Sequence, residues 1–270
     1  MILNKRFEQS EKAGVRIANG YIAFRKVRMN VHCFVVDGVL IDTGGFSLRK
    51  EFMEFLDAKD IEQVLLTHHH EDHTGNAAYM QKKGIPLYMG EETILSCMEK
   101  AHYPLYRKLF WGKRPPLCAE PLSKTLKSKN AIWDVINTPG HSIDHKSFLN
   151  RETGQLFTGD LYCLERTRVI LRDESIPTII KSLERVLTYD FQEVICNHAG
   201  YLNNGRQKLY RKLEFLWEFQ EQVKKLHAEG KSTSEIDRLL NPKKYPISRF
   251  SLGEWDSIHM VTSVLEERVE

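Results

Sequence analysis

Cysteine is scarce in this sequence, and the residues present follow no recognisable pattern. The chain has 270 residues and five cysteines, an odd number with no C-x-x-C pair. They are Cys33, Cys97, Cys118, Cys163 and Cys196. Because a disulfide framework needs closely spaced cysteines in even number, the sequence predicts reduced thiols and a cytoplasmic location.

Long hydrophobic runs and a strong excess of one charge are also missing. No stretch approaches the ~20 uninterrupted apolar residues of a membrane helix. The N-terminus becomes charged after three residues, which predicts that it is not a signal peptide. The 39 basic and 36 acidic side chains leave a formal net charge of +3. A charge so close to balance argues against nucleic acid or a membrane surface as a partner.

Apolar residues make up 41 % of the chain, which is enough for a sizeable core. Short apolar or alternating runs predict strands at 15–17, 21–27, 31–36, 39–41, 61–67, 86–89, 132–136, 146–149, 155–158 and 193–196. Helical spacing predicts helices at 47–58, 74–83, 91–100, 176–187, 206–229, 234–240 and 254–267. Strands that alternate with helices in two successive halves predict an α/β fold, with two sheets packed together and helices outside.

Local signals add detail to the first half. Asn19-Gly20 and Asp37-Gly38 are dipeptides that favour tight hairpin turns, because their residues tolerate positive φ. Ser47 is a candidate N-cap for the helix at 47–58. These signals predict several short strands joined by hairpins before the first helix.

The chemistry-bearing residues begin with the sequence THHHEDHTG at 67–75. This motif follows a buried strand and opens a helix, so its side chains emerge at the carboxyl end of a sheet, where α/β folds place ligand sites. His68 and His70 can project to one side, while His69 points away. Asp72 and His73 lie on the turn into the helix. Imidazole and carboxylate ligands together suit zinc or a similar divalent cation.

Three further ligand-type residues stand just after predicted strands. His141 follows the strand at 132–136, Asp160 follows the one at 155–158, and His198 follows the one at 193–196. Each is a weak signal alone, but together with the first motif they predict one metal centre. His145, close behind His141, is interpreted as a structural residue rather than a ligand.

With these motifs the chain resembles the metallo-β-lactamase-fold hydrolase superfamily, whose H-x-H-x-D-H signature it matches. Its metal motif is similar to those of hydroxyacylglutathione hydrolases and lactonases. The resemblance implies an αβ/βα four-layer sandwich with two divalent metal ions, most simply zinc, with manganese or iron as alternatives. It implies that the ligands are His68, His70 and His141 for one metal and Asp72, His73 and His198 for the other, with Asp160 bridging. Asp42, in the early D-T-G turn, would orient a ligand histidine, unless it is an ordinary turn aspartate.

The composition and the helical pattern of the chain also predict its organisation. Residues 1–205 would form the catalytic domain, and residues 206–270 a helical extension packed on the same domain, as core packing or a homodimer surface. Residues 100–130, rich in basic and aromatic side chains, would be an insert. This insert is interpreted as a solvated connector or as a lid that grips an anionic substrate. Nucleic-acid binding is the third and least favoured alternative.

The implied reaction is hydrolysis by a metal-bridging hydroxide. Two divalent cations with two carboxylates and the bridging hydroxide leave a small positive charge, which favours an anionic or polarised small molecule. A small ester, thioester or lactone is the leading substrate class, with Asp72 as the catalytic carboxylate; Tyr162 is a weak candidate for a general acid. The alternatives are a phosphodiesterase or ribonuclease on the same fold and a sulfur dioxygenase with a single iron. A binding protein on an inactive fold should have lost some ligands, whereas every position is filled here.

Overall fold

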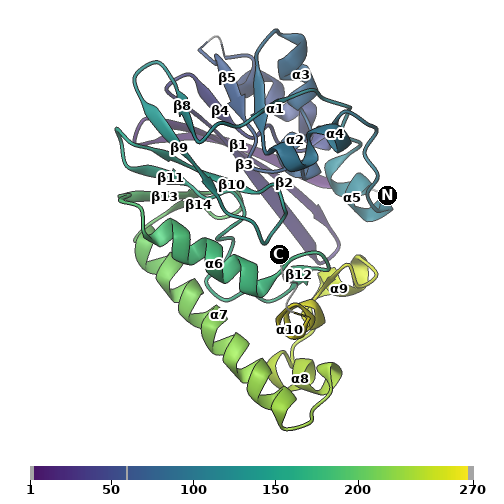
Figure 1. The fold of residues 1–270 in the computed structure, drawn as a ribbon. Coiled ribbons are helices and arrows are strands. Elements are labelled where there is room, and N and C mark those ends of the chain that lie inside the picture. The colour runs from purple at the N-terminus through teal and green to yellow at the C-terminus, as the bar shows by residue number, and fades with distance from the viewer. Residues whose placement is uncertain (1–2, 59, 267–270) are drawn as a thin grey trace.

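Two β-sheets lie face to face in the computed structural model, which describes residues 3–58 and 60–266. Helices cover the outer side of each sheet, which gives the predicted αβ/βα sandwich (Figure 1). The first sheet runs in the order β1 to β7, and the second in the order β14-β13-β11-β10-β9-β8. A short pair, β12 and β15, lies apart from both sheets. The four-layer arrangement predicted from the sequence is therefore confirmed.

The first half of the chain forms the first sheet and its helices. Its strands are β1 (Asn4–Lys12), β2 (Val15–Phe24), β3 (Val27–Val36), β4 (Val39–Ile41), β5 (Gln63–Leu65), β6 (Leu87–Met89) and β7 (Glu120–Pro121). Its helices are η1 (Phe46–Leu48), α1 (Arg49–Leu56), α2 (Glu71–Thr74), α3 (Ala77–Lys82), η2 (Glu91–Thr93), α4 (Ile94–Cys97) and α5 (Leu105–Trp111). Strands β1 to β4 are joined by antiparallel pairing, and β4 to β7 run parallel.

The second half forms the other sheet and the C-terminal helices. Its strands are β8 (Thr125–Lys127), β9 (Ile132–Asn137), β10 (Lys146–Asn150), β11 (Gln155–Phe157), β12 (Ile170–Leu171), β13 (Glu193–Cys196), β14 (Gly200–Leu202) and β15 (Trp255–Asp256). Its helices are α6 (Ile176–Leu187), α7 (Gly205–Ala228), α8 (Thr233–Leu240), α9 (Pro246–Phe250) and α10 (Ile258–Leu265). The predicted elements at 176–187 and 193–196 match α6 and β13 residue for residue.

Three apolar layers hold the sandwich together. Phe34 of β3 and Phe148 of β10 meet between the sheets. Val35 and Leu149 follow these residues in the chain and point to the outer faces of the sheets. Val35 packs toward α1, and Leu149 packs toward α6. Because both faces of these strands are buried, they read in the sequence as continuous apolar runs.

Two local predictions were wrong. The dipeptide Asn19-Gly20 lies inside β2 and makes no turn. A Cβ at Gly20 would lie 2.6 Å from the side chains of Leu48 and Phe52. The glycine therefore serves the close packing of α1 against the strand. Ser47 is part of η1 and caps nothing; its hydroxyl donates to the carbonyl oxygen of Phe110. The turn at Asp37-Gly38 is confirmed.

Residues 100–130 connect the two sheets. They hold α5, then β7 at the edge of the first sheet, then β8 at the edge of the second. Several of their cations are engaged within the protein: Arg107 pairs with Glu71, and Arg114 donates to the carbonyl oxygens of Cys97 and Pro115. The segment is thus built into the edges of both sheets.

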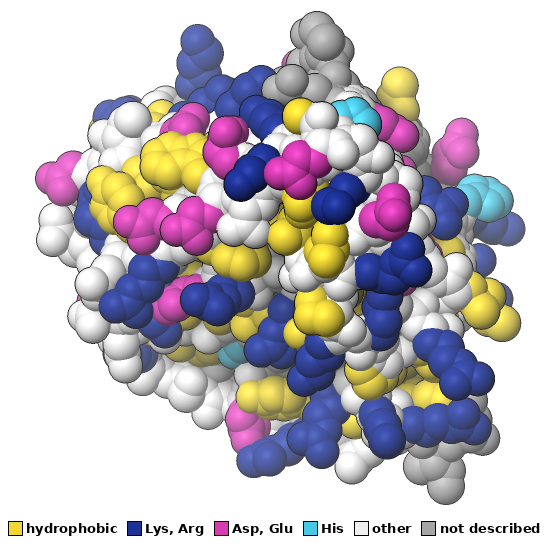
Figure 2. All heavy atoms as spheres, turned by 90° about the horizontal axis from the view of Figure 1, so that it is seen from below, with side chains coloured by type: hydrophobic (Ala, Val, Ile, Leu, Met, Phe, Trp, Pro, Cys, Tyr) yellow, Lys and Arg dark blue, Asp and Glu magenta, His cyan; other side chains and the backbone are white. Residues whose placement is uncertain are grey.

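Helices α7, α8 and α10 pack beside α6 on the second half of the molecule, whereas α9 lies against β3 of the first sheet. Leu213 of α7, Ile236 of α8 and Met260 of α10 share one apolar cluster with α6. Seen from below, this end of the molecule shows lysine and arginine side chains gathered beside exposed hydrophobic ones (Figure 2). The pairing of β15 with β12 brings residues 245–255 next to the loop that follows Asp160. Among residues 3–58 and 60–266, no helix is long and apolar enough to span a membrane.

Candidate metal centre

The predicted ligands meet where strands of both sheets end. His68 comes shortly after β5 of the first sheet, while His141, Asp160 and His198 come after β9, β11 and β13 of the second. Each strand is held by apolar packing on both faces, and its last residues lead into a loop that turns toward the other sheet. Elements far apart in the chain therefore deliver their polar side chains to one place.

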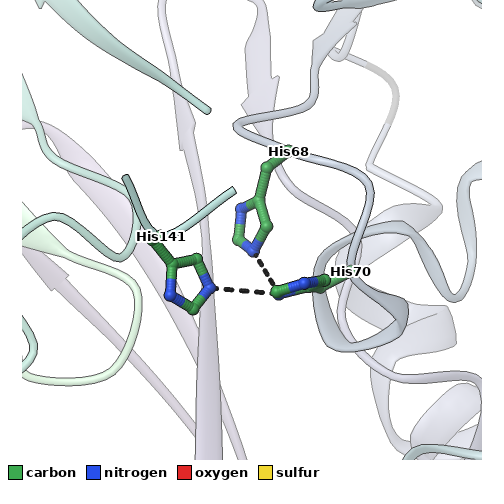
Figure 3. A group of neighbouring side chains, drawn as sticks. All are labelled: His68, His70 and His141. Carbon is green, nitrogen blue, oxygen red and sulfur yellow. Dashed lines mark hydrogen bonds between the residues drawn. The ribbon is translucent and has the colours of Figure 1, made fainter. Parts of the chain in front are cut away.

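Three histidines form the first group. The Nε2 of His68 lies 2.9 Å from the Nδ1 of His70, and the Nε2 of His141 lies 3.0 Å from that same atom (Figure 3). Burial lowers the pKa of both His68 and His70 well below the ordinary histidine value, so their rings are neutral and have lone pairs to donate. Three imidazole nitrogens converging on one point suit a divalent cation such as zinc.

Asp72, His73 and His198 form the second group. The Oδ2 of Asp72 lies 3.7 Å from the Nε2 of each of these histidines. Asp160 stands between the two groups: its Oδ2 is 2.9 Å from the Nε2 of His198 and 3.4 Å from the Nε2 of His141. This position lets one carboxylate face both groups.

Two donor atoms of this centre are arranged to bind a cation rather than to hydrogen-bond with each other. Among the described residues, the Nε2 of His73 and the Oδ1 of Asp160 are buried and have no hydrogen-bond partner, although they lie 3.5 Å apart. Burial lowers the pKa of His73, but the carboxylates of Asp160, Asp42 and Asp72 outweigh this effect and hold its pKa well above the usual value. The centre therefore concentrates negative charge that a bound cation would offset.

Asp42 orients His73 of the second group. Its side chain is fully buried; one oxygen accepts from the amide of Thr67 at 2.8 Å. The other oxygen accepts from the Thr67 hydroxyl, the Asn197 side-chain amide and the Nδ1 of His73, at 2.8, 2.7 and 2.7 Å. A proton on His73 Nδ1 leaves Nε2 with its lone pair directed at the centre. A turn aspartate exposed to solvent would have none of these contacts.

Comparison with known proteins agrees with this geometry. A family model described as the metallo-beta-lactamase superfamily matches residues 28–196, which is more than half of the chain. The chain belongs to this superfamily. A beta-lactamase domain protein from Burkholderia ambifaria superposes with a TM-score of 0.68 at 18 % identity, covering 96 % of this chain and 89 % of that one. At that identity the likeness shows the fold alone.

Two curated relatives of this superfamily chain have names that state an activity. The thioesterase pkgB of Emericella nidulans is 32 % identical over 126 residues, 45 % of this chain and 32 % of the relative. A hydroxyacylglutathione hydrolase of Psychromonas ingrahamii is 28 % identical over 234 residues, 83 % of this chain and 81 % of the relative. The match to pkgB thus spans about a third of that relative's length.

Two acidic residues that were not predicted from the sequence contact histidines of these motifs and help to hold the centre in place. The Oε2 of Glu174 lies 3.2 Å from the Nδ1 of His141, and the Oδ1 of Asp144 lies 2.9 Å from the Nδ1 of His69. Nothing in the sequence marks these acids, because their partners are more than 30 positions away or belong to another motif. Cys163, predicted as a reduced thiol, also offers its Sγ beside Asp160 and His198.

His145 bears directly on the placement of Asp160. Its Nε2 accepts from the amide of Asp160 at 2.9 Å, and its Nδ1 lies 2.9 Å from the hydroxyl of Thr138. Burial lowers the pKa of His145 to about 3, so the ring stays neutral and can accept this hydrogen bond. Gly159 makes the contact possible, since a Cβ there would lie 2.5 Å from the His145 ring.

A cavity of about 460 Å³ opens beside the centre. His70, Asp72, His141, Asp160 and His198 face it from the metal side. Side chains of β3, α5, the loop at 163–171 and the C-terminal segment at 245–255 form much of the remaining wall, together with Ile179 of α6 and Lys212 of α7. Tyr162 is not among the lining residues; it packs in the apolar cluster around α6.

Proposed function

We propose that this protein is a metal-dependent hydrolase that cleaves an ester-type bond in a small molecule. The observation that carries the proposal is the convergence of the Asp160 carboxylate with both histidine groups. The names of the relatives support the bond type, since one is a thioesterase and another a hydroxyacylglutathione hydrolase. A thioester is therefore the first substrate class to test, with simple esters and lactones next.

In this proposal the centre holds two divalent cations. His68, His70 and His141 would hold one, Asp72, His73 and His198 the other, with Asp160 bridging. Zinc suits this donor set best, and manganese or iron are the alternatives. When bound, such cations polarise a carbonyl oxygen and lower the pKa of water to about 7, which supplies the nucleophile.

Side chains of the protein orient the proposed ligands and accept a proton. Asp42 holds the proton on His73 Nδ1, and Glu174 does the same at His141 Nδ1, so that both Nε2 atoms face the centre. Asp72 is the proposed catalytic carboxylate: its Oδ2, near His73 and His198, can accept the proton of the attacking water. No serine or cysteine nucleophile is needed.

We also infer a domain organisation. Residues 1–205 would form the catalytic domain and residues 206–270 an extension packed on it. The packing of the extension on the domain is supported by the apolar cluster that α6 shares with α7, α8 and α10. The extension would also contribute to the substrate cavity through residues 245–255.

Cleavage of nucleic acid has less support than cleavage of a small molecule. The basic segment at 100–130 is the one feature that favours it, and both of its arginines are engaged within the protein: Arg107 with Glu71 and Arg114 with backbone carbonyls. The cavity beside the centre has more apolar than polar lining. Both features favour a compact, partly apolar substrate.

The test combines metal analysis with a substrate panel. Purified protein is expected to hold about two divalent metal ions per chain and to hydrolyse at least one thioester, ester or lactone. Asp72→Ala and His198→Ala should each lower kcat at least about 100-fold, since each removes a proposed ligand. Asp173→Asn, an exposed neighbour of the site, is the control and should leave turnover unchanged.

Three results would contradict the proposal: a folded protein that refuses transition metals, full turnover in both variants, or hydrolysis of phosphodiesters alone. Iron as the native metal, with oxygen uptake on a persulfide, would identify a dioxygenase instead.

A further inference from the structure

The cavity beside the metal centre has an extended apolar wall. Its apolar side chains come from three separate stretches of the chain, namely Leu164, Ile170 and Leu171, Ile179 of α6, and Ile247 with Trp255 of the C-terminal segment. Ile170 and Leu171 are held in place by the pairing of β12 with β15. This strand pairing fixes the middle of the wall, and the apolar surface as a whole suits an alkyl or aryl group.

Most charged groups in this cavity are already engaged. Glu71 binds Arg107 through two hydrogen bonds of 2.7 and 2.6 Å, and Glu174 contacts His141 while accepting from the amide of Leu171. Lys212 donates to two backbone carbonyl oxygens, at 2.8 and 2.5 Å. Asp72 and Asp160 belong to the metal centre. None of these groups is free to bind a charged substrate.

Arg28 and Arg168 differ from the other charged lining residues. Both line the cavity and are exposed, and neither has a carboxylate at ion-pair distance within residues 3–58 and 60–266. The Arg168 guanidinium lies over the ring of Tyr245, 5.6 Å from its centroid, which restricts its position. These two guanidiniums are the cations of this cavity that remain available to an anion.

Arg28 is also placed close to the metal centre by the strand that carries it. Arg28 and Asn30 are two residues apart on β3, so their side chains share one face about 7 Å apart. The side-chain amide of Asn30 donates to the carbonyl oxygen of His198 at 2.9 Å. An anion held by Arg28 would thus lie on the side of the cavity where Asn30 contacts His198.

From this arrangement we propose that the cavity selects an amphipathic, anionic ester or thioester, with one arm apolar and the other anionic. The inference rests on the proposed hydrolase function and names the substrate class for the same site. The two arms of a thioester diverge from its carbonyl carbon, so each can meet a wall of different chemistry. The apolar arm lies along Ile170, Ile179 and Trp255, and the anionic group binds Arg28 and Arg168.

The kinetic test uses substrates that differ only in charge. Octanoyl-3-mercaptopropionate carries the anion on the thiol arm, and the S-octyl monothioester of succinic acid carries it on the acyl arm; each is compared with its neutral amide. At least one anionic member should exceed its amide by about tenfold in kcat/KM, through a lower KM. The double variant Arg28→Gln/Arg168→Gln should abolish that preference with kcat nearly unchanged. Arg166→Gln, exposed in the same loop but outside the cavity, should keep it.

A binding measurement separates this inference from the hydrolase proposal. Trp111 and Trp255 line the cavity, so intrinsic fluorescence can report the binding of thioether analogues that cannot be hydrolysed. The thioether acid should bind about tenfold tighter than its amide, and the double variant should bind both alike. This result without any turnover would support the substrate site while refuting the hydrolase.

Two outcomes would overturn the inference itself. Equal affinity for acid and amide in the unaltered protein would show that the cavity does not recognise the anion. A preference that survives in the double variant would show that the anion is bound by the metal centre rather than by the two arginines.

Discussion

Glu174 is the residue whose effect on the centre can be isolated most cleanly. It contacts His141 Nδ1 at 3.2 Å and is buried, but it is not one of the predicted ligands. Glu174→Gln keeps the shape of the side chain and removes the charge that fixes the ring. We expect zinc affinity to fall by about 10- to 100-fold, as measured by competition with a chelator, while the thermal unfolding of the metal-free protein changes little.

The neighbouring Asp173 provides the control for this prediction. It is exposed, and Asp173→Asn should leave the zinc affinity as it is. If Glu174→Gln binds zinc as tightly as the unaltered protein, the contact to His141 has no role in metal binding.

The ligand-type residues could be predicted from the sequence because each stands directly after an apolar strand. His68, Asp160 and His198 carry this signal, and the structure brings them together. The groups that orient them could not be predicted in the same way. Glu174 and Asp144 meet their histidines only through the packing of loops from different strands, which leaves no local pattern in the chain.

Helix α5 acts at the scale of an element, because it ties the connecting segment to the metal loop. Its Arg107 makes a bidentate ion pair with Glu71 and a further ion pair of 3.2 Å with Glu254. Glu71 is nearly fully buried and precedes Asp72 in the chain. Arg107→Ala would leave Glu71 buried without a partner. We expect a loss of about 3 kcal/mol in unfolding free energy, measured by urea denaturation.

A second change in the same pair tests the cause of that loss. Adding Glu71→Gln should recover part of the stability, because the uncompensated charge is gone. Lys113→Ala, an exposed position after the same helix, should change stability by less than about 0.5 kcal/mol. Equal stability of Arg107→Ala and Lys113→Ala would mean that the ion pair contributes nothing.

The elements that differ from prediction do so where tertiary contacts override local signals. A helix was predicted over 74–83, but α2 ends at Thr74 and α3 begins only at Ala77; between them, a Cβ at Gly75 would lie 2.3 Å from the backbone nitrogen of Phe46. The helix predicted from 254 starts only at Ile258, since Trp255–Asp256 pairs with β12. Strand β1, almost wholly exposed, has no apolar pattern that could have predicted it.

The arrangement of the whole molecule was easier to predict than these details. Strands buried on both faces leave continuous apolar runs, and only two sheets covered by helices can bury so many of them. The position of the metal centre follows from the same arrangement. The strand ends of both sheets meet along one edge, so the site requires the two halves to stay packed.

Asp37 connects the two halves at the turn between β3 and β4. Its carboxylate accepts from the hydroxyl of Ser128 and from both amide groups of Asn130, at 2.9 and 2.7 Å, in the turn between β8 and β9. Burial raises the pKa of Asp37, but these hydrogen bonds outweigh it, and the pKa lies below the usual value. A carboxyl with a depressed pKa stabilises the fold above its unfolded pKa of about 3.9, and this contribution is lost as the pH falls through the folded pKa.

Asp37→Asn should therefore destabilise the protein at pH 7 and cause a smaller loss of stability at acidic pH. Asparagine tolerates the φ of +51° at this turn, so the backbone is not strained by the change. We expect a loss of about 1 kcal/mol at pH 7, a modest value because solvent screens the site. Urea denaturation at several pH values should show the difference between variant and unaltered protein shrinking toward pH 3, whereas Asp173→Asn should show none at any pH. A difference independent of pH would mean that the carboxylate charge has no part in joining the two sheets.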